Sequence, residues 1–534
     1  MQKNLILAVV LSSLVYIGWY SFVEKKIQPP PAAQAQTAAA PAAAAQPAPA
    51  AVPTEASSLV KEAQDVLRET IAGPAEGAGA ARSGANLAKA LTSVEAGKAR
   101  YTFFIADGSL ASVIYQGPVA PAELVPASGQ GFFAASLPGE YKLKSNTGKT
   151  VEFVAQNGPV RITKKYSFSA DNGMNSLEIE AVNASASVQV LPAWELRLGP
   201  GLDTVPSEMK ENEAELKAVY TYREAGRKHP TLKEIEADEP AAHDWAWTGL
   251  NNRYFLAALS GASFSNTRPV RRDHKVGDQK EVPQLVVPMA GATLAPGQKA
   301  AWTSQFYFGP KDYARLTQLG GGLDRAVDFG FFAPLAKFAN SSLIYFHKLT
   351  GNYGAAIIIL SVIIQLLLTP LSYKSYKAMA VMKKIQPEMQ SLQQRYKSDP
   401  QRMNKEIMDL YKRHGTNPLG GCLPMLLQIP VFFALFTALR NSWDLHGANF
   451  VFWIKDLSAK DPYYVLPLVM GGIMFLQQHL SPQTSDPAQA AMMKWMPVIF
   501  TFMFLTFPSG LVLYWLINSI WGFAQSMYLQ KKMA

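Results

Sequence analysis

Residues 354–371 read GAAIIILSVIIQLLLTPL and lie in a longer uncharged run between Lys348 and Lys374. A helix rises about 1.5 Å per residue, so about 20 apolar residues cross the hydrocarbon core of a bilayer. Three more uncharged runs follow this one, and another lies near the N-terminus. The sequence therefore predicts a membrane protein whose spans cluster after residue 350.

The last uncharged run is too long for a single span. It holds 36 residues between Lys494 and Lys531, and Pro-Ser-Gly at 508–510 divides it. Pro and Gly so placed are turn residues. The run therefore predicts two spans joined by a tight membrane hairpin.

Residues 5–23 form the uncharged run near the N-terminus, with Trp19 and Tyr20 close to its end. Aromatic residues of this kind suit a membrane interface. The run predicts an uncleaved anchor span, and the alternative is a cleaved signal peptide, for which the run is long. The predicted fold class is an α-helical membrane core of five spans plus this anchor.

The charge of the chain is localised. Lys and Arg number 50 and Asp and Glu 40, a net charge of +10. Residues 27–372 hold 31 basic and 31 acidic residues, whereas residues 373–418 hold ten basic and four acidic. The excess positive charge is concentrated in one short segment, as in a loop that fixes the orientation of a membrane protein. This pattern gives no reason to expect DNA as a partner. The single cysteine, Cys422, excludes a disulfide scaffold and a metal site with several Cys ligands.

The basic run at 373–418 predicts the orientation, because loops rich in Lys and Arg stay in the cytoplasm. Alternating spans then place the short basic tail at 530–534 on the same side. The predicted order is a cytoplasmic N-terminus (1–4), an anchor span (5–23), an Ala/Pro-rich tether (24–99), an outer β-sandwich domain (100–320), an interfacial amphipathic helix (325–347), a span (350–372), a cytoplasmic helical hairpin (373–418), a span (419–439), an outer loop (440–462), a span (463–480), a cytoplasmic loop (481–494), two spans (495–507 and 511–529) and a cytoplasmic tail (530–534).

The outer domain is predicted to be all-β. Residues 177–182 alternate apolar and acidic side chains, the period of a half-buried strand. Glu239, His243 and Asp244 could form a catalytic cluster, but a polar loop before a strand is the simpler interpretation. The predicted strand segments are 101–105, 110–115, 151–154, 177–182, 188–191, 253–259 and 305–308.

The cytoplasmic hairpin is predicted to hold two helices, at 375–396 and 401–414. Asp399 followed by Pro400 is a favourable start for the second helix, and Pro387 is expected to break or kink the first. A basic amphipathic surface beside a membrane is typical of contact with anionic lipid, or simply of a solvated face. A ribosome or a ribosome-bound receptor is a further interpretation.

Several classes of chemistry leave no motif in the sequence. The G-x-x-x-x-G-K-[ST] loop of nucleotide-binding proteins and the G-x-S-x-G turn of serine hydrolases do not occur. Deep inside the predicted spans there is no Asp, Glu, Lys or Arg, which ion-coupled transporters usually keep there. We therefore expect no enzyme, no cofactor and no energy-coupled pump.

The predicted spans instead contain hydroxyl and amide groups. Ser361 and Gln365 are four residues apart and share one helix face, and Gln428, Thr506 and Tyr514 lie in other spans. Such groups are costly to leave unpaired in lipid. They predict either hydrogen bonds between helices or a shared hydrated groove for the polar part of a passing polypeptide.

Four segments of the C-terminal half resemble one known family. NPLGGCLPMLLQIPVFFALF at 417–436, DLSAKDPYYVLPLVMG at 456–471, MPVIFTFMFL at 496–505 and FPSGLVLYW at 507–515 are similar to the YidC membrane protein insertases. The resemblance runs through residues 342–534. The anchor, tether and outer domain resemble the Gram-negative branch, whose periplasmic domain is a β-supersandwich similar to sugar mutarotases.

The resemblance implies a protein of the bacterial inner membrane that inserts and folds other membrane proteins. It would work alone or with the Sec translocon, without hydrolysing ATP. Its partners would be nascent membrane proteins, the phospholipid bilayer and, by its basic hairpin, a ribosome or targeting receptor. In the family, five spans form a groove open to the cytoplasm and to lipid, and the second and last spans guide the substrate.

The resemblance also suggests site residues. Ser361 falls where the family has a small hydroxyl residue, and Tyr514 and Trp515 fall on a substrate-contacting aromatic pair. Gln365 occupies the position where the family typically has an arginine, so charge attraction between that residue and the substrate is not expected here. The predicted groove residues are Ser361, Gln365, Gln428, Thr506, Tyr514 and Trp515. The predicted contacts of the cytoplasmic hairpin are Lys383, Lys384, Met389, Arg395, Met403 and Arg413.

Two other functions remain open at this point. One is a membrane-anchored periplasmic protein that binds carbohydrate or resembles a mutarotase. The other is a channel or transporter. The first would depend on the outer domain and the second would pass solute or current.

Overall fold

The computed structural model describes residues 91–128, 130–171, 173–222, 230–237, 240–241, 244–276, 280–416, 423–480 and 487–533. The predicted anchor, nearly all of the tether, Glu239, His243 and Cys422 lie outside these residues.

The outer domain is built around a large antiparallel sheet of nine strands. Successive neighbours in it are antiparallel throughout. Its strands, in spatial order, are β13 (Thr231–Glu234), β12 (Lys217–Tyr222), β14 (Trp245–Asn251), β15 (Phe255–Ser260), β19 (Lys299–Pro310), β9 (Asn175–Asn183), β8 (Val160–Ser167), β7 (Thr150–Asn157) and β6 (Glu140–Asn146).

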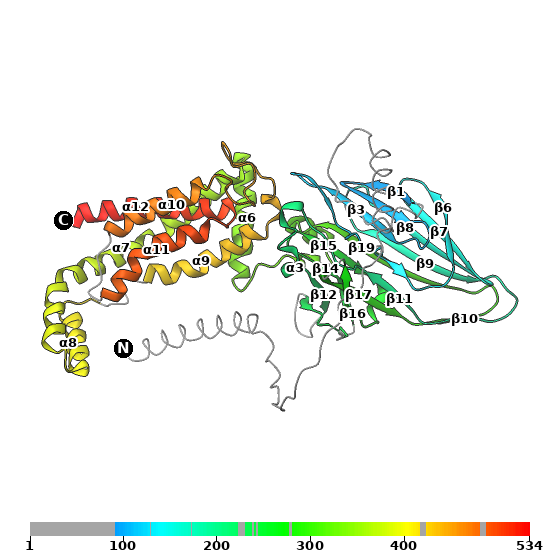
Figure 1. Ribbon diagram of the computed structural model, residues 1–534, viewed down its shortest axis with the longest axis horizontal. Helices are drawn as coiled ribbons and strands as arrows, with labels where there is room; N and C mark the ends of the chain where they lie inside the picture. The colour runs from blue at the N-terminus through cyan, green and yellow to red at the C-terminus, as the bar shows by residue number, and fades with distance from the viewer. Residues whose placement is uncertain are drawn as a thin grey trace, which may run out of the picture. The chain divides into compact units, whose positions relative to one another are not determined.

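Smaller sheets complete this domain (Figure 1). One has the order β16 (Val270–Val276), β17 (Lys280–Met289), β11 (Trp194–Leu198) and β5 (Ala134–Ala135). Another has the order β1 (Leu91–Ala96), β2 (Ala99–Phe104), β3 (Leu110–Gln116) and β4 (Pro121–Glu123), and β10 (Gln189–Leu191) pairs with β18 (Ala292–Leu294). Short helices lie at η3 (Pro206–Glu208), α3 (Asn212–Glu215), α4 (Ala262–Ser265), α5 (Tyr313–Leu319) and η4 (Leu323–Ala326).

The sheets share one hydrophobic core. Phe103 of β2, Phe153 of β7, Leu196 of β11 and Leu285 of β17 are all fully buried within it. In β9 buried residues alternate with half-buried ones, as the apolar–acidic pattern at 177–182 predicts. Each of the seven predicted strand segments overlaps a strand, and sheets packed over a common core are the arrangement of a sandwich.

The C-terminal part of the chain is helical. By length and composition, α7 is long and apolar enough to cross a membrane, and shorter apolar helical stretches lie at Leu426–Arg440, Val465–Gln478 and Lys494–Phe504. The helices are α6 (Ala333–Thr350), α7 (Tyr353–Arg395), α8 (Pro400–Arg413), α9 (Leu423–Arg440), η6 (Trp443–Leu445), α10 (Val465–Leu480), α11 (Pro487–Phe504) and α12 (Ser509–Met533).

Some predicted boundaries are wrong. Helix α7 continues without a break from the predicted span into the predicted cytoplasmic hairpin and contains Pro387. Pro387 is exposed, so water can satisfy the carbonyl that its missing N–H leaves free. Close by, Ile385 is buried, as is Leu410 of α8, and α7 packs against α8 (Figure 1). Packing against α8 therefore stabilises α7 as a helix on the side away from Pro387.

Other helix ends also differ from the prediction. Helix α6 begins at Ala333 and not near residue 325, and α11 begins at Pro487, inside the predicted loop at 481–494. By contrast, α8 begins as predicted: the Asp399 carboxylate accepts a hydrogen bond of 3.0 Å from the Arg402 N–H. A capping side chain signals its own position in the sequence, whereas an uncapped helix end is set by packing.

The short connection between α11 and α12 is held by a neighbouring loop. The Ser509 N–H donates to the Ala459 carbonyl at 2.7 Å, and the Gly510 N–H donates to the Leu457 carbonyl at 2.9 Å. The Ser509 hydroxyl also donates to the Ala459 carbonyl, at 2.8 Å. The Pro-Ser-Gly turn is thus fixed by backbone pairing to residues about 50 positions earlier.

Candidate functional site

Helix α12 carries polar side chains that contact its neighbours. Gln365 of α7 donates a hydrogen bond from Nε2 to Oδ1 of Asn518 at 2.8 Å. Both side chains are only half-buried. This pair joins α7 and α12 through two uncharged amides, each of which keeps further capacity to donate or accept.

A second polar contact joins α12 to α9. Gln428 donates from Nε2 to the hydroxyl oxygen of Tyr514 at 2.7 Å. Tyr514 is almost fully buried, whereas Gln428 is half-buried. Among apolar helices, a buried hydroxyl needs such a partner.

A third contact lies farther along α12. The hydroxyls of Tyr376 and Ser526 are 2.6 Å apart. Between these contacts, a Cβ added to Gly522 would lie 2.9 Å from Nε2 of Gln477 on α10, so the two helices approach closely there. Tyr514, Asn518, Gly522 and Ser526 recur every four residues and therefore follow one stripe of the helix, which we call the α12 polar row.

The remaining predicted groove residues lie differently. Ser361 is buried, and its hydroxyl donates to the Ile357 carbonyl of its own helix at 2.6 Å. Thr506 is exposed in the α11–α12 connection and donates to the Met503 carbonyl at 3.1 Å. The structure thus brings Gln365, Gln428 and Tyr514 to α12, but Thr506 makes its hydrogen bond locally.

Trp515 belongs to an aromatic cluster. Its ring centroid lies 5.0 Å from that of Phe432 on α9, and 5.6 Å and 5.1 Å from those of Phe500 and Phe504 on α11. Such aromatic pairs add about 0.5–1.5 kcal/mol each beyond the area they bury. Beside the polar row, α12 therefore has an aromatic surface that ties it to α9 and α11.

The helical hairpin of α7 and α8, predicted to be cytoplasmic, exposes most of its predicted contact residues. Met389 and Met403 are half-buried, and the Tyr411 hydroxyl donates to Sδ of Met389 at 3.2 Å. The basic side chains are exposed, namely Lys383, Lys384, Arg395 and Arg413. The hairpin therefore presents positive charge around a small apolar seam.

Sequence reasoning missed three members of the polar contacts. Tyr376 and Ser526 are 150 residues apart, and Gly522 has no side chain to attract notice. The four-residue spacing from Tyr514 to Ser526 was the available signal. As for other sites, the described residues contain no group of three or more His, Cys, Asp or Glu that could hold a metal ion.

A β-rich domain followed by apolar helices with polar side chains between them defines a multi-domain membrane protein. Residues 345–534 match the family described as 60Kd inner membrane protein, and residues 111–339 match the family described as YidC periplasmic domain. The membrane protein insertase YidC of Citrifermentans bemidjiense is 41% identical over 414 residues, which are 76% of this chain and 74% of the relative. The chain belongs to the YidC family of membrane protein insertases.

A second relative matches along the whole chain. The membrane protein insertase YidC of Geobacter metallireducens is 35% identical over 556 residues and covers 100% of this chain and 99% of the relative. A crystal structure of an active YidC insertase with its first transmembrane domain resolved covers 89% of this chain and 100% of its own, with 16% identity and a TM-score of 0.39. The resemblance found in residues 417–515 is confirmed by the family matches and relatives, and the family is one of insertases and not of enzymes.

Proposed function

We propose that this chain inserts membrane proteins into the inner membrane by way of the α12 polar row. The polar end of an incoming segment would exchange hydrogen bonds with Gln365, Asn518, Gln428 and Tyr514. Its apolar stretch would slide between α7 and α12 into lipid. The observation that carries this proposal is the half-buried amide pair Gln365–Asn518, which joins the two helices named as the guide.

The free energy of the Gln365–Asn518 hydrogen bond is small enough for the pair to open when a substrate passes. Side-chain hydrogen bonds between membrane helices average about 0.6 kcal/mol, so exchanging one for a substrate bond costs little. An unsatisfied polar group in hydrocarbon costs several times more. The polar row would therefore lower the barrier to a polar segment without binding it so tightly that it cannot leave.

The neutral residue at 365 changes the mode of recognition. A fixed charge would favour segments of the opposite charge, whereas an amide can donate to or accept from any polar group. We infer that this insertase is indifferent to the sign of the charge near the leading end of its substrates. In this proposal the half-buried amides of Gln365 and Asn518 are sufficient for that role.

The cytoplasmic hairpin would receive the nascent chain. Its exposed Lys383, Lys384, Arg395 and Arg413 suit an anionic partner such as a ribosome or targeting receptor, and its methionines suit apolar segments. Cooperation with the Sec translocon is part of the same proposal. So is the topology of five core spans and an N-terminal anchor, with the N-terminus in the cytoplasm and the β domain in the periplasm.

Reconstitution tests the proposal. The purified full-length chain in liposomes should insert a single-span substrate, and photo-crosslinkers at positions 365 and 515 should reach a stalled nascent chain. Liposomes that show no insertion, or crosslinks to lipid alone, would overturn it. Solute flux or conductance without insertion would indicate a channel or transporter, and carbohydrate turnover would indicate a mutarotase-like protein.

A further inference from the structure

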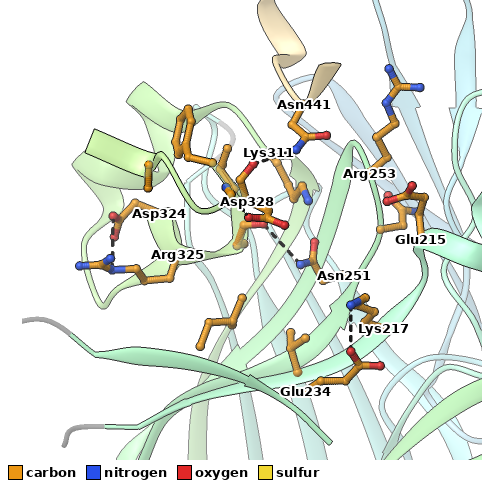
Figure 2. A pocket seen from close by; sticks show the side chains of 18 of the residues that line it. Glu215, Lys217, Glu234, Asn251, Arg253, Lys311, Asp324, Arg325, Asp328 and Asn441 are labelled. Carbon is orange, nitrogen blue, oxygen red and sulfur yellow. Dashed lines mark hydrogen bonds and ion pairs between the residues drawn. The ribbon is translucent and has the colours of Figure 1, made fainter. Parts of the chain in front are cut away.

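A cavity of about 780 Å³ lies where the β domain meets the first turn of α6 and the end of α9. The edge strand β13, its neighbour β12, η4 and the segment before α6 form its walls. Figure 2 shows charged side chains from these elements around one opening. This cavity is separate from the α12 polar row.

Most charges around the cavity are paired. Lys217 contacts Glu234 at 2.9 Å, and Arg325 contacts Asp324 at 3.9 Å (Figure 2). Two further ion pairs join Arg440 to Glu215 and Arg253 to Glu208. These pairs neutralise one another and leave little net charge.

Lys311 is the exception. It lines the cavity, is only 5% exposed, and its ammonium has no hydrogen-bond or ion-pair partner among the described residues. Burial lowers the pKa of Lys311 to about 7. Near pH 7 only part of the Lys311 population is therefore protonated, and an anion bound in the cavity would stabilise that charged form.

A second unpaired ammonium lies in the same cavity. Lys337 of α6 has no carboxylate partner among the described residues and lies 5.1 Å and 5.7 Å from the ring centroids of Tyr313 and Phe329. The negatively charged Asp328 also lines the cavity, and its carboxylate accepts a hydrogen bond from the Gly330 N–H at 2.7 Å. When Lys311 is protonated, two ammonium groups face one carboxylate among the unpaired charged groups of the described cavity lining, which leaves one positive charge unbalanced.

The walls and surroundings indicate the kind of anion. Val219, Leu232 and Phe329 give the cavity an apolar side. On α6, Lys337 faces the cavity while Phe338 is strongly exposed, as is Phe331 just before the helix. If these aromatic side chains lie in the bilayer interface, as exposed apolar faces of interfacial helices do, the cavity is at the height of the lipid headgroups.

We propose that this cavity binds the phosphate of an anionic phospholipid headgroup, with Lys311 and Lys337 as its cationic contacts. The apolar wall would receive the glycerol and the start of an acyl chain. The bound lipid would join the β domain to α6 and α9. The proposal goes beyond insertion and relies on the proposed function only for the outward orientation of α6.

Protection of Lys311 from an amine-acetylating reagent tests the site. The full-length protein is placed in nanodiscs of phosphatidylcholine alone or with phosphatidylglycerol, and modification at pH 6 is followed by mass spectrometry. A bound anion raises the pKa of Lys311, and each unit of rise lowers the reactive neutral fraction about tenfold at this pH. Phosphatidylglycerol should slow Lys311 about tenfold and leave the exposed Lys299 unchanged; equal rates in the two nanodiscs would overturn the proposal.

Variants and soluble anions separate the possible sources of the anion. Lys311→Met should lose phosphatidylglycerol retained through mild purification, as read by native mass spectrometry, and Lys299→Met should retain it. Inorganic phosphate and glycerol 3-phosphate should not protect Lys311 at the same phosphate concentration. Equal protection by either would show a small-anion site, and protection only by an acidic peptide would show a peptide site; both outcomes overturn the lipid assignment.

Discussion

Nε2 of Gln365 on α7 lies 2.8 Å from Oδ1 of Asn518 on α12 and donates a hydrogen bond to it. The bond crosses between the two helices along which we propose that substrates slide. Because neither partner is charged, the pair can open without stranding an ion in lipid. The opening and closing of this hydrogen bond is therefore the step that substitutions of Gln365 and Asn518 should affect.

Removing either amide should slow insertion, and removing both should slow it further, but by less than the sum of the two single effects. Gln365→Leu leaves Asn518 without its partner, Asn518→Leu does the reverse, and the double variant strands neither. We expect a coupling free energy of about 0.6 kcal/mol between the two changes, the average for such bonds in membranes. Insertion rates in proteoliposomes for the four proteins of the cycle give this value.

The control for that cycle is Gln394→Leu, the same change at an exposed position near the C-terminal end of α7. It should insert at the wild-type rate. Unchanged insertion in both single variants would show that groove polarity at these positions is unimportant.

The Tyr514 hydroxyl should matter as much as its partner. Tyr514→Phe removes one oxygen and leaves Gln428 Nε2 without this partner, and Gln428→Leu removes one of the two side-chain partners of the buried hydroxyl, the other being Asn518. Each change should destabilise the packing of α12 against α9 by about 1 kcal/mol. The insertion rate should fall by the factor that corresponds to this free energy. Tyr528→Phe, on an exposed position of the same helix, is the matched control. A wild-type melting temperature and insertion rate for Tyr514→Phe would contradict the role given to this bond.

The parts of the fold that local patterns determine could be predicted from the sequence. The alternation at 177–182 gives a strand because side chains on a strand point alternately to opposite faces. Asp399 before Pro400 gives a helix start because the cap and the proline act within one turn. The uncharged runs reveal apolar helices for the same local reason.

Contacts between distant segments could not be predicted in the same way. Tyr376 meets Ser526 across 150 residues, and only the packing of α7 on α12 brings them together. Pro387 continues a helix because the hairpin packs on its other side, which local propensity does not record. Lys311 looks like any surface lysine in the sequence, and its burial appears only once β19, η4 and α6 are assembled.

Arg253 should stabilise the end of α9. Its guanidinium donates two hydrogen bonds to the Arg440 carbonyl, at 2.9 Å and 3.1 Å, and contacts Glu208 at 2.6 Å. The last carbonyls of a helix lack partners within it, so Arg253→Met should destabilise this junction by about 1–3 kcal/mol. Limited proteolysis after residue 440 should become faster than in wild type, and faster than in the exposed-site control Arg161→Met. Equal cleavage of the two variants would show that Arg253 does not hold the helix end.

The stability of the chain should depend on pH through buried groups outside the proposed spans, of which Asp444 and Lys311 act at the lowest pH values that can be assigned. Burial raises the pKa of Asp444 to about 6 and lowers that of Lys311 to about 7. Between pH 4 and 6 the unfolded Asp444 has lost its proton while the folded one keeps it, so stability falls as pH rises. Between about pH 7 and 10.5 the unfolded Lys311 holds a proton that the folded one has lost, so stability rises with pH.

Lys311→Met should therefore be more stable than wild type at pH 7 and should lose most of the rise between about pH 7 and 8. Above pH 8 buried Lys164, whose pKa burial lowers to about 8, contributes a rise of its own. Asp444→Asn should lose the fall between pH 4 and 6 and keep the rise, which separates the two groups. Thermal unfolding of the full-length protein in detergent without anionic lipid gives the slopes, with Lys299→Met expected to follow wild type. A wild-type slope between about pH 7 and 8 in Lys311→Met would mean that another group titrates there. Added phosphatidylglycerol should flatten the same rise in wild type, because an anion beside Lys311 restores its pKa toward the unfolded value and removes the difference between the two states.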